Sequence, residues 1–316
     1  MAKIDREDIH IICDHSNWSE PCVRKMLEEH SYNDVSSWQR FLKLLLLALG
    51  VSFTAAGVIF FFAYNWADLH KFVKLGLIEF LIVSLILTAV FVKTKPLIKK
   101  MLLLAASLMV GALNAVFGQV YQTGADAYDF FLGWTLFVTI WVLFSNFAAL
   151  WILFVTLLNL SLFFYAEQVA HEWSELFLFC LLFAMNVLLL MGFILIPKPL
   201  KMAPFPSWFI QVVALAAVTI STIGLSTGIF DSPEPSFLVL FLMTMLFYGV
   251  GIWYGLKTRS LFYISIIPFS VIIILCAALL DFSNEASMLF AIGIFIVTSI
   301  TLLIKILLNY QKKWAN

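Results

Sequence analysis

The sequence predicts an all-α integral membrane protein, a polytopic bundle of about ten transmembrane helices with both termini in the cytoplasm. Two observations predict this fold class. Hydrophobic residues make up 63% of the 316 residues and charged residues only 12%, whereas about a quarter of a typical soluble domain is charged. The apolar residues also gather in ten long segments, and a helix needs about 20 such residues to cross a hydrocarbon core about 30 Å thick.

Polar or proline-containing connections separate the ten segments, so each segment is expected to form one helix. Only Ser145, Asn146 and Phe147 separate the fourth from the fifth. We expect a tight turn there, because a single helix over residues 128–165 would be about 57 Å long, far longer than a bilayer is thick. The expected spans are residues 41–64, 72–92, 101–120, 130–144, 148–165, 176–196, 208–230, 237–256, 261–280 and 286–308.

The distribution of charge indicates the orientation of these spans. Cytoplasmic loops collect Lys and Arg, and an N-terminus in the cytoplasm assigns all of the 19 basic residues except Lys71 and Lys74 to cytoplasmic segments. An error of one span would move every later basic loop to the other side, so this agreement supports ten spans. The short outer loops carry acidic residues instead: Asp68, Asp126, Asp129, Glu167, Glu172, Glu175, Asp231, Glu234, Asp281 and Glu285.

The membrane boundaries divide the chain into three parts. Residues 1–39 are expected to form a cytoplasmic amphipathic helical segment, in which Ser19, Glu20 and Pro21 resemble a helix start. Residues 40–309 form the predicted transmembrane bundle, and residues 310–316 form a cytoplasmic tail. We expect a seam in the bundle at residues 197–206, because the repeated prolines of this linker cannot continue a regular helix.

Charge and motif content disfavour several functional classes. The formal net charge is zero, so no nucleic-acid partner is predicted, because binding to phosphates requires a basic surface. The sequence has no serine-hydrolase, zinc-protease, P-loop or dinucleotide-binding motif. We therefore predict no catalytic residues and no cofactor, and the sequence leans against an enzyme without deciding the question. Cys13 and Cys22 lie among histidines, but the spacing fits no compact zinc motif, so no metal site is predicted.

Two polar clusters stand at the expected outer ends of the spans. The first cluster, residues 61–71, joins spans 1 and 2, and the second, residues 118–134, joins spans 3 and 4. Because short connections make consecutive helices neighbours, we expect both clusters to share one outer vestibule. The candidate ligand-binding residues are Asn65, Trp66 and Asp68 in the first cluster and Gln119, Tyr121, Gln122, Thr123, Asp126, Asp129 and Trp134 in the second.

These side chains have a functional and a structural interpretation. Carboxylates and amides in one pocket suit a cation, a sugar or an amine as ligand. In the structural interpretation, Asp126 caps the fourth span, the Tyr and Trp side chains form the aromatic belt of the membrane interface, and the amides bond to loop backbone. The sequence leaves both interpretations open.

Polar residues within the spans have their own expected roles. Glu79 lies inside span 2, where an ionised carboxylate costs roughly 3 kcal/mol unless it is paired or protonated. Its expected partner is Asn114 of span 3 or a water-filled cavity, and it is either a proton carrier or a buried, protonated structural residue. We expect Asn159, Asn186 and Gln211 to form interhelical hydrogen bonds.

Two motifs resemble a known bacterial family. They are Phe61-Phe62-Ala63-Tyr64-Asn65-Trp66, and Gly118-Gln119-Val120-Tyr121-Gln122-Thr123-Gly124-Ala125-Asp126 followed by Gly133-Trp134. The chain resembles the predicted membrane proteins of domain of unknown function 2157 over roughly residues 5–170. This resemblance implies a location in the bacterial inner membrane, and it brings no activity or substrate with it.

Three functional hypotheses follow from these observations. The leading one is a multi-pass membrane protein that binds or transports a small polar solute or cation through the outer vestibule, with the lipid bilayer as its other partner. The second is a membrane sensor or assembly partner that transports nothing, in which the N-terminal segment meets another protein. The third and weakest is an enzyme that acts on a lipid-linked substrate.

Overall fold

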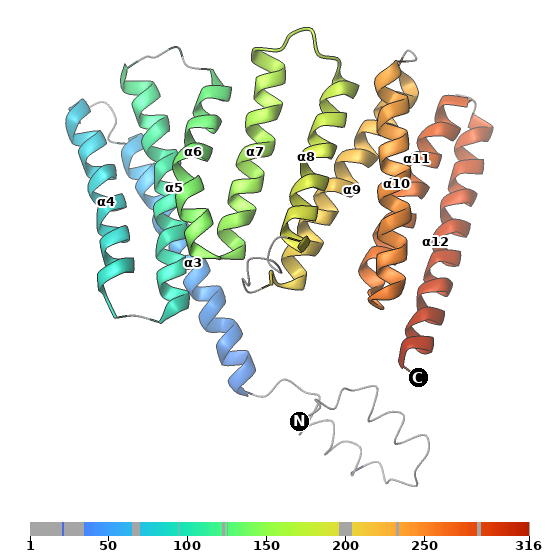
Figure 1. The fold of residues 1–316 in the computed structure, drawn as a ribbon, viewed down its shortest axis with the longest axis horizontal. Helices are drawn as coiled ribbons and strands as arrows, with labels where there is room; N and C mark the ends of the chain where they lie inside the picture. The colour runs from blue at the N-terminus through green and yellow to red at the C-terminus, as the bar shows by residue number, and fades with distance from the viewer. Residues whose placement is uncertain are drawn as a thin grey trace. The chain divides into compact units, whose positions relative to one another are not determined.

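The computed structural model describes residues 21, 35–64, 70–93, 95–121, 124, 126–195, 204–231, 234–282 and 286–315. The regular secondary structure in these residues is α-helical (Figure 1). Ten helices are long and apolar enough to cross a membrane, as predicted. They are α3 (Val35–Tyr64), α4 (Lys71–Phe91), α5 (Pro96–Tyr121), α6 (Ala127–Ser145), α7 (Ala148–Gln168), α8 (Glu175–Leu195), α9 (Ser207–Phe230), α10 (Pro235–Lys257), α11 (Leu261–Phe282) and α12 (Ala286–Ala315).

The predicted break between the fourth and fifth spans is confirmed. Helix α6 ends at Ser145, and α7 begins at Ala148. Asn146 adopts a left-handed conformation with φ of 42°, a conformation that asparagine tolerates better than most residues. The Nζ atom of Lys100 donates a hydrogen bond of 3.1 Å to the carbonyl oxygen of Asn146. A side chain from the start of α5 therefore stabilises this turn.

Three helices extend at least five residues past their predicted bounds. Helix α3 begins at Val35, α5 at Pro96, and α12 continues to Ala315. The predicted bounds followed the apolar residues alone, whereas polar residues such as Lys312 and Lys313 continue the helix beyond the apolar segment. Cations in the last turn stabilise a helix through its dipole. The predicted domain boundaries at residues 40 and 309 rest on membrane surfaces and stay predictions.

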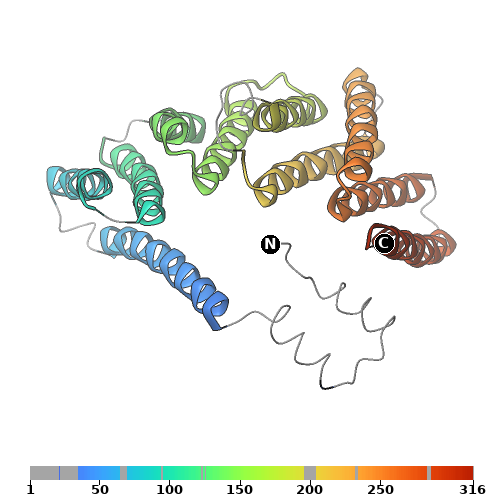
Figure 2. The ribbon, with the colours of Figure 1, turned by 60° about the horizontal axis from the view of Figure 1, so that its bottom comes forward.

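The chain divides into two compact units, one ending at Leu69 and containing α3, the other beginning at His70 and containing α4 to α12. In the second unit α4, α5, α6 and α7 pack in chain order, each against the next. Helix α9 packs against α8, α10 and α11, and α10 also packs against α8 and α11. Within the second unit, consecutive helices run in alternating directions (Figures 1 and 2), so every second connection lies at the same end of this unit.

Large apolar side chains from four helices fill the core around α9. Phe183 of α8, Phe209 of α9, Leu240 of α10 and Ile267 of α11 are all completely or almost completely buried. A Cβ atom added at Gly224 of α9 would lie 2.8 Å from side-chain atoms of Leu240 and Phe179. The helices approach this closely only because the position carries no side chain.

Hydrogen bonds between two side chains join helices at three places in the described part of the second unit. The predicted interhelical role of Asn159 and Asn186 is confirmed, because their amides exchange hydrogen bonds of 3.3 and 2.7 Å between α7 and α8. Thr135 of α6 and Ser161 of α7 lie 3.3 Å apart. Gln211 makes no such bond within the described part of the chain and instead lines a cavity.

The third polar contact is a chain of four buried hydroxyl groups, which we call the hydroxyl network. The oxygen of Ser221 lies 3.0 Å from that of Tyr248, which lies 2.5 Å from that of Ser270, which in turn lies 2.5 Å from that of Thr222. Ser221 and Thr222 belong to α9, Tyr248 to α10 and Ser270 to α11. The network therefore connects three helices in the interior, where an unpaired hydroxyl is costly.

Candidate functional site

The structure describes about half of the residues that the sequence nominates for ligand binding. Gln119, Tyr121, Asp126, Asp129 and Trp134 lie in the described part of the chain, as does the proton-carrying candidate Glu79. The candidates outside the described residues are Asn65, Trp66, Asp68, Gln122 and Thr123.

Lys71, the last residue of the first predicted polar cluster, lies near Tyr121 of the second. The Nζ atom of Lys71, at the start of α4, lies 5.8 Å from the centroid of the Tyr121 ring, at the end of α5. A cation within about 6 Å of an aromatic face is attracted by the ring quadrupole. Tyr121 also packs against Phe117, one turn earlier, with ring centroids 4.7 Å apart. The start of α4 and the end of α5 therefore share one end of the unit.

Asp126 occupies the N-cap position of α6, but its side chain does not cap the helix. Its backbone oxygen accepts a hydrogen bond of 3.3 Å from the amide of Phe130, while the carboxylate makes no capping hydrogen bond. Gln168 at the end of α7 does this instead, because its Oε1 atom accepts a bond of 2.9 Å from the amide of Tyr128. The expectation that the Asp126 side chain is a cap is therefore wrong.

The two acidic groups at this helix start are both open to the surroundings. Asp126 and Asp129 are exposed, and Asp129 lies in the first turn of α6. The helix dipole favours negative charge at this end. Gln119 is also exposed, two residues before the end of α5.

Trp134 lies deeper, between α5 and α6. Its indole Nε1 donates a hydrogen bond of 2.8 Å to the carbonyl oxygen of Ser107. Its ring covers Gly111 so closely that an added Cβ atom there would lie 2.5 to 2.7 Å from the ring carbons. The sequence predicted Trp134 at the polar surface, whereas in the structure its indole N–H bonds to the neighbouring helix α5.

Glu79 and its expected partner Asn114 face different directions. Glu79 is exposed on α4, away from the face on which Ile78 and Ile82 are buried. The Nδ2 atom of Asn114 lies beside Gly133 of α6, 3.6 Å from an added Cβ atom. Lys74, in contrast, is only 7% exposed, a burial that the sequence did not predict.

An aromatic ladder that the sequence analysis missed continues from this end of α6. Tyr128 lies against Tyr165 of α7, Tyr165 against Trp173, and Trp173 against Phe177 of α8, with ring centroids 5.1 to 5.4 Å apart. Tyr and Trp gather at the membrane interface. The sequence signal for this ladder was the position of Tyr and Trp at the ends of two predicted spans.

Among the described residues, no group of three or more His, Cys, Asp and Glu side chains could hold a metal ion.

One comparison with known proteins gives a match. A family model described as "Predicted membrane protein (DUF2157)" matches residues 23–151, a region that includes α3 to α6 and the start of α7. The resemblance inferred from the two motifs is thus confirmed over this region. No curated protein and no solved structure matches the chain.

Proposed function

We propose that this multi-pass membrane protein binds a small cation or amine at the end of the unit where α5 leads into α6. One observation carries the proposal. The carboxylate of Asp126 stands at a helix start without capping it, because Gln168 accepts the hydrogen bond that a capping side chain would take. Asp126 is thus left for a ligand.

The surroundings of Asp126 support a positively charged ligand. Asp129 adds a second exposed carboxylate in the first turn of α6. At the same end of the unit, Tyr121 already holds the ammonium group of Lys71 near its ring, and an amine ligand would find the same attraction there. We include Gln119, and Asn65, Trp66, Asp68, Gln122 and Thr123 outside the described residues, as further members of this site.

We further propose that the protein transports the ligand that it binds. A carboxylate in the middle of an apolar helix is characteristic of ion and proton pathways, and we assign this role to Glu79. Binding without transport would instead correspond to a sensor.

We further propose that this site faces the outside of the bacterial inner membrane. Because helix directions alternate in the second unit, the helix termini at one end contain or adjoin the described basic residues Lys93, Lys95, Lys99, Lys100, Lys257 and Arg259. The acidic residues Asp126, Glu167, Glu172, Asp231 and Asp281 lie at the opposite end. Positive charge marks the cytoplasmic side, which supports placing both termini in the cytoplasm.

Reconstitution of the full chain in liposomes tests this proposal. We would measure electrical current under pH jumps and a panel of cations and amines, and ligand binding by calorimetry. The native protein is compared with Asp126→Asn and with Glu167→Gln, which removes an exposed acid at the end of α7. We expect current and binding to be lost in Asp126→Asn and retained in Glu167→Gln.

The other outcomes are distinct. Binding without current, still lost in Asp126→Asn, would keep the site and replace transport with sensing. Equal behaviour of Asp126→Asn and native protein, both shown to be folded by circular dichroism, would overturn the site.

A further inference from the structure

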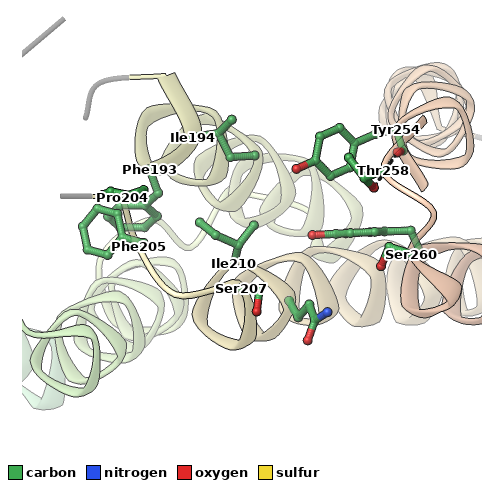
Figure 3. Close-up of a pocket in the computed structure, with 11 residues that line it drawn as sticks. Phe193, Ile194, Pro204, Phe205, Ser207, Ile210, Tyr254, Thr258 and Ser260 are labelled. Carbon is green, nitrogen blue, oxygen red and sulfur yellow. Dashed lines mark hydrogen bonds between the residues drawn. The ribbon is translucent and has the colours of Figure 1, made fainter. Parts of the chain in front are cut away.

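A polar cavity lies at the opposite end of the second unit from Asp126. It has a volume of about 400 Å³, and it is formed where α8 ends, α9 begins and the α10–α11 hairpin turns (Figure 3). Among the described residues, its polar lining consists of hydroxyl and amide groups, without Lys, Arg, Asp or Glu. These polar residues are Ser207, Gln211, Tyr254, Thr258, Ser260 and Tyr263.

The α10–α11 hairpin holds two tyrosines at this cavity. The amide of Ser260 donates a hydrogen bond of 2.9 Å to the carbonyl oxygen of Gly255. Gly255 is buried, and an added Cβ atom there would lie 3.0 Å from the Cβ of Tyr263. The rings of Tyr254 and Tyr263 meet edge to face, with centroids 5.4 Å apart, and Tyr254 points toward the space between Ile194 and Ile210 (Figure 3).

A second cavity of about 510 Å³ adjoins the polar one. Ile194, Tyr254 and Tyr263 line both cavities. The remaining lining is apolar and comes from α8, α9, α10 and α11. Four lining residues are well exposed, namely Met191 at 49%, Leu195 at 55%, Leu246 at 72% and Val250 at 54%. The apolar cavity therefore opens between α8 and α10, on a surface that would face lipid in a membrane.

We propose that the two cavities form one binding site for an amphiphile with a single acyl chain and an uncharged polyol headgroup, of the monoacylglycerol class. Each volume falls in the range of about 300–1,000 Å³ that is typical of ligand pockets. Hydroxyl groups of the protein both donate and accept, as a polyol does. A phosphate headgroup would instead favour Lys or Arg in the lining, and none of the described lining residues is basic.

The polar cavity supplies the selectivity of this site. An acyl chain already lies in an apolar medium within the bilayer, so its transfer into the apolar cavity has little hydrophobic driving force. The headgroup must therefore be recognised by hydrogen bonds. Within the described part of the chain, the amide of Gln211 has no hydrogen-bond partner, which leaves it available to a ligand.

Photolabelling of the full chain in lipid nanodiscs tests the proposal. The probe is a monoacylglycerol with a diazirine in its acyl chain, and the control probe carries the same chain on a phosphate headgroup. We expect the first probe to label α8 and α10 near Met191 and Leu246, with competition by unlabelled monoacylglycerol. Gln211→Leu and Tyr254→Phe should each weaken that competition about fivefold to tenfold, the effect of losing one hydrogen bond.

Two further variants test the apolar cavity. Leu246→Trp places an indole at its mouth and should abolish labelling. Leu302→Trp makes the same change at an exposed position of α12 and should leave labelling intact. Labelling by the phosphate probe with equal competition would overturn the headgroup assignment. Unchanged labelling in Leu246→Trp would overturn the site.

Discussion

At the scale of single residues, Gly111 shows how a missing side chain positions a large one. The Trp134 ring covers this glycine, and its indole N–H reaches the carbonyl oxygen of Ser107 one turn earlier on α5. A methyl group at Gly111 would overlap the ring, so α6 or the indole would have to move. Gly249 of α10 has no atom within 4 Å of an added Cβ position and provides the matched control.

We predict that Gly111→Ala lowers the free energy of unfolding by about 1–3 kcal/mol, the usual cost of overpacking. Thermal unfolding in detergent, followed by tryptophan fluorescence, measures this. Gly249→Ala should leave stability unchanged or raise it slightly, because Ala favours helix. Equal stability of native protein and Gly111→Ala would mean that Trp134 does not pack as described.

The Asn159–Asn186 pair makes a second prediction at this scale. A double-mutant cycle of Asn159→Ala and Asn186→Ala should give a coupling free energy of about 0.6–1.7 kcal/mol, the range known for hydrogen bonds between membrane helices. Among the described residues, Thr298 of α12 bonds only to its own helix, through the carbonyl oxygen of Ile294. Pairing Thr298→Ala with Asn159→Ala should therefore give no coupling, and coupling there would show that the assay does not isolate pairs.

At the scale of helices, the hydroxyl network joins α9, α10 and α11 through one chain of hydrogen bonds. We predict that Tyr248→Phe lowers the free energy of unfolding by about 1 kcal/mol, because Ser221 and Ser270 each lose one partner and keep another. Tyr310→Phe in α12 is the matched control and should have no effect. Loss of stability in both variants to the same degree would argue against a specific network.

The helices were largely predictable from the sequence, whereas their contacts were not. Apolar segments of about 20 residues have few alternatives to membrane helices, and Ser145–Phe147 had to be a turn. The hydroxyl network could not be predicted, because Ser and Thr occur throughout such helices and only helix rotation decides which of them meet. The same reason explains Trp134 and Asn114, whose positions near a polar cluster did not reveal that they face the α5–α6 contact.

At the scale of the whole molecule, the charges of the connections predict the orientation. In a chain whose four cysteines are replaced, Glu172→Cys should react with a membrane-impermeant maleimide added to spheroplasts. Lys95→Cys should react only after the membrane is permeabilised. The reverse pattern would invert the orientation proposed above, and labelling of both from outside would contradict the ten-span arrangement.

The candidate site was predictable only in part. Exposure of Asp126 and Asp129 follows from their place in an acidic loop, and contact between the two clusters follows from short connections. That Gln168 frees the Asp126 side chain from capping could not be predicted, because the two residues are separated by the whole of α6 and α7.

The packing of the second unit also has a consequence for biosynthesis. Helices α4 to α7 contact their neighbours in the sequence, so each can pack as soon as it leaves the ribosome and enters the membrane. The hydroxyl network needs Ser270 of α11, and it therefore closes only when most of the chain has been made. Because domains generally fold from the N-terminus during synthesis, the part formed by α4 to α7, where Asp126 lies, is assembled before the cavities lined by α8 to α11 exist.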